Sequence, residues 1–105
     1  MKIDRELFVW TDAWLLLALL YSGFPSDRKR IEVVGDGINH AIFTEQELNG
    51  GLKRLIACCH VVENIGLYSP AEAVDVWYRT VSPKRSSMSK DLERVCKFLN
   101  VSEKA

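Results

Sequence analysis

Hydrophobic residues recur at helical spacing in several stretches of the chain, and residues 44–61 form the best defined of them. Thr44 and Glu47 have the spacing of a capping box, in which each side chain bonds a free backbone N–H at the helix start. Apolar residues then follow at intervals of three and four, which predicts a helix with one buried face. That face is expected to hold Leu48, Leu52, Leu55, Ile56 and Cys59.

The most apolar stretch, residues 13–21, predicts a first helix that is buried almost all round. Thr11 or Asp12 can cap it, and Gly23 followed by Pro25 ends it. The run is too short to cross a bilayer, which needs about 20 apolar residues. A helix this apolar has more surface than a small core needs, so it is expected to meet the last helix, either in the same chain or in a second copy.

A second helix is expected between these two, with Ser26 or Asp27 as its cap. Its interior contains Gly35 and Gly37, and each glycine costs about 1 kcal/mol relative to alanine in a helix. The pair therefore predicts a bend or a break near Asp36.

The chain after residue 60 predicts a hairpin and two further helices. Residues 61–68 are two short β-favouring runs around an Asn and a Gly. Ser69 as cap and Pro70 at the first helical position then predict a helix that ends before Pro83. A last amphipathic helix is expected from about Ser89.

These elements predict a mainly α fold with a small β-hairpin, in the α+β class. We expect a three-helix core, a hairpin wing and two C-terminal helices. The expected divisions are an N-terminal arm over residues 1–10, a winged-helix domain over 11–82, and a C-terminal helix for packing or dimerisation over 83–105.

Two segments carry a resemblance to a known class of protein. They are WTDAWLLLALLY and GDGINHAIFTEQELNGGLKRLIACCHVVENIGLYSPAEA, and together they extend over roughly residues 11–82. This stretch resembles the winged helix-turn-helix domains of bacterial regulators. It is similar in particular to small uncharacterised bacterial proteins that carry the equivalents of Asp36, the INHAIFT segment at 38–44, and Glu47-Leu48. The resemblance implies a winged-helix fold, and with it either DNA binding or protein contact.

Charge does not favour nucleic acid overall. The 105 residues include 14 Lys and Arg and 14 Asp and Glu, so the formal net charge is zero. Any attraction to DNA must therefore come from a local patch. The three cysteines are an odd number and do not form a disulfide framework, so we expect reduced thiols and a cytoplasmic protein.

A candidate DNA-binding patch lies on the outward face of helix 44–61 and on the first turn of the helix before it. Asn and Gln side chains can read adenine, and Arg or Lys can read guanine or bind phosphate. The patch would consist of Arg28, Lys29, Arg30, Gln46, Asn49, Lys53 and Arg54. Against it, Glu45 and Glu47 stand at the helix start, and the wing has Glu63 and Asn64 but no Arg or Lys.

Two hypotheses follow. The first is a transcription-regulator-like protein that binds double-stranded DNA, with 44–61 as recognition helix in the major groove, and that forms a homodimer through its first and last helices. The second is a winged-helix module that contacts another protein and does not bind DNA.

No catalytic site, cofactor, metal site or membrane partner is expected. Cys58, Cys59, His60 and His40 offer no ligand set, because neighbouring helical residues diverge by about 100°. Cys59 is expected on the core face with Cys58 at its margin, and no nucleophile is placed to converge on His40. Gly50 and Gly51 lie inside the long helix, where they would let another backbone come close.

Overall fold

The structure is a computed structural model that describes residues 7–102, so most of the predicted arm lies outside the described residues. In this part of the chain the fold is mainly helical with one two-stranded antiparallel hairpin, which confirms the predicted α+β class. The elements are α1 (Trp10–Tyr21), α2 (Arg28–Asn39), α3 (Glu45–Ala57), β1 (Val61–Asn64), β2 (Leu67–Pro70), α4 (Glu72–Val81) and α5 (Met88–Leu99).

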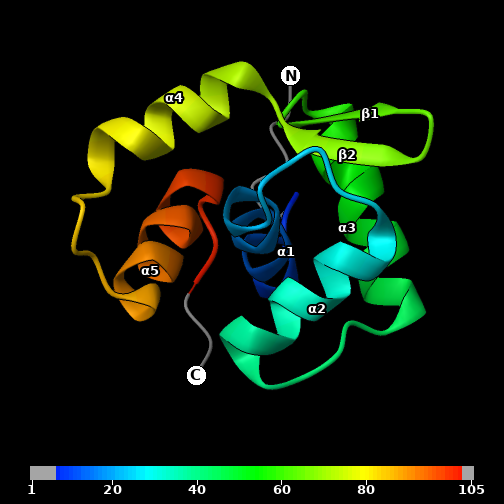
Figure 1. The fold of residues 1–105 in the computed structure, drawn as a ribbon, viewed down its shortest axis with the longest axis horizontal. Coiled ribbons are helices and arrows are strands. Elements are labelled where there is room, and N and C mark those ends of the chain that lie inside the picture. The colour runs from blue at the N-terminus through cyan, green and yellow to red at the C-terminus, as the bar shows by residue number, and fades with distance from the viewer. Residues whose placement is uncertain (1–6, 103–105) are drawn as a thin grey trace.

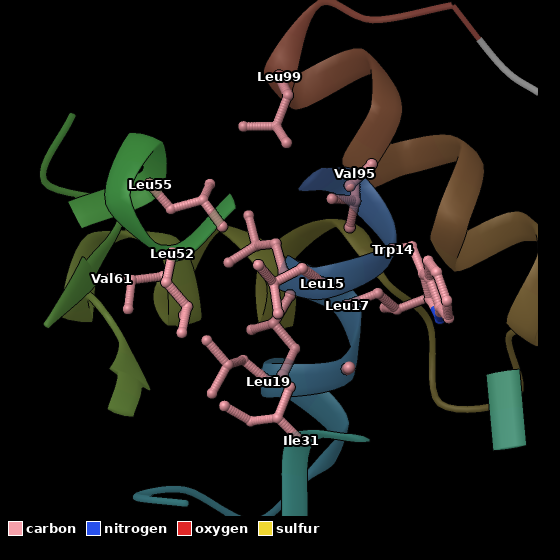
Figure 2. Close-up of a cluster of buried hydrophobic side chains, with 14 of the residues drawn as sticks. Trp14, Leu15, Leu17, Leu19, Ile31, Leu52, Leu55, Val61, Val95 and Leu99 are labelled. Carbon is pink, nitrogen blue, oxygen red and sulfur yellow. The ribbon is translucent and has the colours of Figure 1, made fainter. Parts of the chain in front are cut away.

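Helix α1 lies at the centre of the fold, with α2, α3, β2 and α5 packed around it (Figure 1). Its residues 12–20 are all buried. Figure 2 shows Leu15, Leu17 and Leu19 of α1 between the leucines of α3 and Val95 and Leu99 of α5. The chain itself thus covers the apolar surface of α1. Of the two expected alternatives, the contact between the first and last helices is therefore made within the chain, and the homodimer stays a prediction.

The start of α1 differs from the prediction by two residues. Val9 is the cap residue, and Asp12 lies inside the first turn, where its carboxylate accepts a hydrogen bond from the Val9 N–H at 3.1 Å. Thr11 is likewise inside the helix. The helix ends as expected, with Gly23 in a left-handed conformation at φ 69°.

Helix α2 begins at the predicted cap, where the Asp27 carboxylate accepts from the Arg30 N–H at 2.9 Å. It then runs unbroken through Gly35 and Gly37, contrary to the predicted bend.

The reason is a tertiary contact at Gly35. A Cβ there would lie 2.5 Å from Cε2 of Phe43, which stacks on Trp14 with 3.8 Å between ring centroids. The Trp14 indole N–H also donates to the Gly35 carbonyl at 2.9 Å. Gly35 therefore lets an aromatic pair pack against α2, and it does not break the helix.

Helix α3 begins with the predicted capping box. Thr44 accepts from the Glu47 N–H at 3.0 Å, and Glu47 accepts from the Thr44 N–H at 2.9 Å. The predicted core positions Leu48, Leu52 and Leu55 are buried, and Ile56 is half-buried.

The end of α3 comes earlier than the predicted residue 61. The helix stops at Ala57, Cys59 adopts a left-handed φ of 63°, and Val61 already belongs to β1. Cys59 is exposed, so its placement on the core face was wrong, whereas Cys58 is half-buried. A helical pattern continued across a turn caused this error, because Cys59 no longer follows the helix.

The predicted hairpin is present, with Val61 opposite Pro70 and Asn64 opposite Leu67. Because Ser69 and Pro70 belong to β2, the prediction that they start a helix was wrong, and α4 begins at Glu72 after Ala71. Strand pairing extends to the Ala71 N–H, which donates to the His60 carbonyl at 2.8 Å.

A third segment pairs with the hairpin. Ser26, in the connection between α1 and α2, exchanges backbone hydrogen bonds with Tyr68 of β2 at 2.8 and 2.9 Å. The hairpin is thus tied to the start of the α2–α3 unit.

The two C-terminal helices differ in how they are held. Helix α5 is capped by Ser87, which accepts from the Lys90 N–H at 3.2 Å, and it packs Val95, Cys96 and Leu99 against α1. Helix α4 ends before Pro83 as predicted and arches above α5 (Figure 1). Within the described residues, none of the helices has the length and apolarity needed to cross a membrane.

Candidate functional site

The α2–α3 unit carries the predicted patch, and several of its polar groups bind one another. The Arg28 guanidinium donates to the Asn49 side-chain carbonyl and forms an ion pair with Glu45 at 3.5 Å. The Asn49 amide in turn donates to Glu45 at 3.1 Å. This network ties the first turn of α2 to α3 and occupies two side chains that were candidates for base or phosphate contact.

Arg54, the strongest cation of the predicted patch, is held by α1. Its Nε and Nη2 donate to the two carboxylate oxygens of Asp12 at 2.7 and 2.9 Å. The Asp12 side chain is fully buried, whereas that of Arg54 is 34% exposed. The hydrogen bonds from Arg54 to this carboxylate raise the pKa of the guanidinium. The pair neutralises the Arg54 charge at the surface of α3.

Gly51 makes room for this ion pair. A Cβ on Gly51 would lie 2.9 Å from the Asp12 Oδ1 and 2.6 Å from a methyl carbon of Leu15. The prediction that these glycines admit another backbone is therefore corrected: side chains of α1 approach Gly51, and Gly50 faces the Arg54 guanidinium of its own helix.

The other predicted patch residues are exposed, and three of the four are cations. Lys29, Gln46 and Lys53 make no hydrogen bond or ion pair within residues 7–102. The Arg30 Nε donates to the Ser22 carbonyl at 3.3 Å. Lys29, Arg30 and Lys53 thus make no ion pair within residues 7–102 and remain as the available cations of the predicted patch.

The outward face of the hairpin carries two exposed apolar side chains beside two polar ones. Val62 is opposite Ser69 and Leu67 is opposite Asn64, and residues two apart on a strand share a face, so these four side chains lie on the side away from the core. The exposed fractions of Val62 and Leu67 are 53% and 42%. Ile65, at the turn, is 92% exposed and has a left-handed φ of 53°. A β-branched residue in this conformation is unfavourable by about 1–2 kcal/mol, so the turn is both strained and apolar.

A second polar cluster joins α1, α4 and α5 at Asp91. One carboxylate oxygen accepts from the hydroxyls of Tyr21 at 2.5 Å and Tyr78 at 2.7 Å. The other accepts from Ser82 at 2.8 Å and Arg94 at 2.9 Å. The side chain of Asp91 is buried. Its donors come from the end of α1 (Tyr21), from α4 and its C-cap (Tyr78 and Ser82) and from α5 itself (Arg94).

This environment shifts the pKa values of the cluster. Burial raises the pKa of Asp91, but hydrogen bonds from Tyr21, Tyr78 and Ser82 outweigh it and leave the pKa below the usual value. Burial, helped by the contact with Asp91, raises the pKa of both tyrosines. All three groups therefore keep one protonation state near neutral pH, which suits a structural tie between helices.

The histidines and cysteines do not gather. His40 ends α2 in a left-handed conformation, and His60 lies against Phe8 and Phe98, where burial lowers its pKa. Within residues 7–102, no three His, Cys, Asp or Glu side chains are close enough to hold a metal ion.

Comparison with known proteins adds no relative: no family model, curated protein or solved structure matches this chain.

The sequence patterns missed both buried carboxylates. Asp12 lies directly before the apolar run of α1, and a charge that is buried there needs a partner. The sequence could therefore have predicted that Asp12 forms an ion pair. Nothing local indicated that the partner is Arg54, 42 residues away. Asp91 gave no signal at all, since it lies in the first turn of an ordinary amphipathic helix, where an acid is common.

Proposed function

We propose that this protein is a winged helix-turn-helix module that binds another protein through the exposed apolar residues of its hairpin. The order of elements supports the fold: α1, the Ser26 strand segment, the α2–α3 pair, then β1 and β2. The bridge from Ser26 to Tyr68 adds a contact between the hairpin and the connection that leads into α2.

The observation that carries the proposal is the exposed hairpin turn. Ile65 combines an unfavourable backbone conformation with a nearly fully exposed apolar side chain, and neither feature benefits the isolated fold. Val62 and Leu67 are the other exposed apolar residues of the hairpin and lie on its outward face. Small protein contacts are commonly built around such apolar anchors, which a partner buries.

Charge supports a protein partner over duplex DNA. DNA affinity depends on cations that neutralise phosphates. Arg54 and Arg28 are bound to carboxylates of the same chain, and Glu63 stands on the hairpin where a DNA-binding wing would carry a cation. The net charge of zero supplies no compensating field.

Site-specific photo-crosslinking tests the proposal. A photoreactive residue is placed at position 65 of the full chain in its host cells, and a matched one at Val33, which is also apolar and exposed on α2. We expect a discrete protein adduct from position 65 that is absent from position 33. Mass spectrometry identifies the crosslinked protein, and a second copy of this chain is one of the possible results. Equal labelling at the two positions, or none, would refute the hairpin as a contact surface.

Ile65→Asn is the companion variant. Asn tolerates the left-handed conformation, so it should stabilise the hairpin by about 1 kcal/mol while removing the apolar contact. Excess expression of the wild-type chain in the same cells, but not of the variant, is expected to abolish the adduct at position 65.

Duplex binding is the decisive alternative. Fluorescence anisotropy with a mixed-sequence duplex across a salt series should show no binding at physiological salt. Micromolar binding whose logarithm falls linearly with the logarithm of salt, and which weakens in Lys53→Ala, would overturn the proposal in favour of a DNA-binding regulator.

A further inference from the structure

A cleft of about 330 Å³ is lined by residues of α4 and α5. These two helices lie on the side of the fold away from the hairpin turn (Figure 1). Ligand sites in proteins have volumes of roughly 300–1,000 Å³, so the cleft suits a small molecule. Its floor is apolar: the rings of Trp77 and Phe98 lie 4.3 Å apart, and Val81 adds an exposed aliphatic wall. Arg94 and Lys97 of α5 complete the lining.

The two cations at the edge of this floor have hydrogen-bonding capacity to spare. Arg94 uses Nη1 to donate to Ser86 at 2.6 Å and Asp91 at 2.9 Å, and its Nε and Nη2 make no bond within residues 7–102. The Lys97 ammonium is exposed and makes no ion pair in the same part of the chain. A guanidinium with two free edges can still bind a carboxylate.

A second hollow of about 240 Å³ has both of these cations in its lining as well. Its other lining residues are Lys90 and Glu93. The carboxylate of Asp91 is buried and bonded to hydroxyls and to Arg94, whereas the half-buried Glu93 is the acid that lines the second hollow. The apolar cleft thus shares its two cations with a polar region lined by three cations and one acid, and among these cations Arg94 is paired with Asp91.

We propose that the α4–α5 cleft binds a small amphiphilic carboxylate, with its hydrocarbon part on Trp77 and Phe98 and its carboxylate at Arg94 and Lys97. The apolar floor supplies affinity in proportion to the hydrocarbon area that it covers. The cations supply the preference for an acid over a neutral molecule of the same length. This site is separate from the hairpin surface and does not depend on the function proposed for it.

Calorimetric titration of the full chain with decanoate, below the concentration at which it forms micelles, tests the site. We expect a dissociation constant of about 1 mM or tighter. Acetate and decanol are the comparison probes, since one lacks the chain and the other lacks the charge. Both are expected to bind at least threefold more weakly. Decanol that binds as tightly as decanoate, or decanoate that does not bind at millimolar concentration, overturns the proposal.

The location is tested by a matched pair of variants on α4. Val81→Asp places a carboxylate in the cleft, where it repels the ligand and competes for the cations, and it should weaken decanoate binding more than tenfold. Val76→Asp adds the same charge to an exposed position of the same helix outside the cleft and should change binding less than twofold. Equal affinities in the two variants would place the ligand elsewhere.

An NMR signal distinguishes binding in the cleft from a general effect on the fold. The indole N–H of Trp77 should shift on addition of decanoate, whereas that of Trp14, buried and bonded to the Gly35 carbonyl, should not. A larger shift at Trp14 than at Trp77 refutes the site. Lys97→Gln should weaken decanoate binding about threefold and leave decanol unchanged, with Lys53→Gln on α3 as its control.

Discussion

Replacement of Arg54 by Met tests the most consequential contact in the structure. The Met side chain keeps much of the apolar volume of the arginine stem but removes the guanidinium. The carboxylate of Asp12 would then remain fully buried with only the Val9 N–H, at 3.1 Å, as a hydrogen-bond donor within residues 7–102.

The expected cost follows from burial. Breaking a fully buried ion pair by removing one partner costs about 3–5 kcal/mol, because a charge is left without compensation. The side chain of Arg54 is 34% exposed, so water reaches the pair and reduces this figure. We therefore expect Arg54→Met to lower the free energy of unfolding by about 2–3 kcal/mol.

Urea unfolding at pH 7, followed by circular dichroism of the helices, measures this loss. With a slope of about 1.5 kcal/mol/M, the midpoint should fall by about 1.3–2 M. Lys53→Met, on the adjacent and fully solvated position, should change stability by less than about 0.5 kcal/mol. A loss in Arg54→Met no larger than in Lys53→Met would refute the argument that Arg54 serves the fold, and would return it to the candidate DNA contacts.

Two further predictions concern tight packing and acid stability. Gly35→Ala should destabilise the protein by about 1–3 kcal/mol, because its Cβ would overlap the ring of Phe43. Gly37→Ala, with open space around it, should instead stabilise α2 by up to about 1 kcal/mol. Thermal unfolding of both variants measures the difference, and equal effects would contradict the packing argument. The pKa of Asp91 is lower in the folded protein than the value of about 3.9 in the unfolded chain, so the ionised carboxylate stabilises the fold above that pH. This stability is lost as the pH falls through the lower, folded pKa. In urea titrations, wild type should therefore lose stability from about pH 5 downward more steeply than Asp91→Asn, and parallel slopes would contradict this stabilising role.

Local sequence signals predicted helix starts well where a cap and its partner lie within one turn. Thr44 with Glu47, and Asp27 alone, behave as expected because their hydrogen bonds join residues three apart. The core leucines of α3 follow for the same reason, since helical spacing alone places them on one face.

The errors occurred where distant residues decide the outcome. Gly35 stays helical because Trp14 and Phe43 pack on it, and Ser69 is a strand residue because it pairs with Val62. In isolation, both positions have the local preference that was predicted. The tertiary contacts outweigh preferences of about 1 kcal/mol or less.

The candidate site divides in the same way. The sequence by itself determined the class of fold, the apolar central helix, the hairpin and the absence of any overall positive charge, because these depend on composition and on spacing within single elements. Only the tertiary structure decided which charges are free. In the folded chain Arg54 is paired with Asp12, Asp91 accepts hydrogen bonds from two tyrosines, and Ile65 remains exposed. These outcomes depend on side chains far apart in sequence, which compete for the same partners once the helices pack.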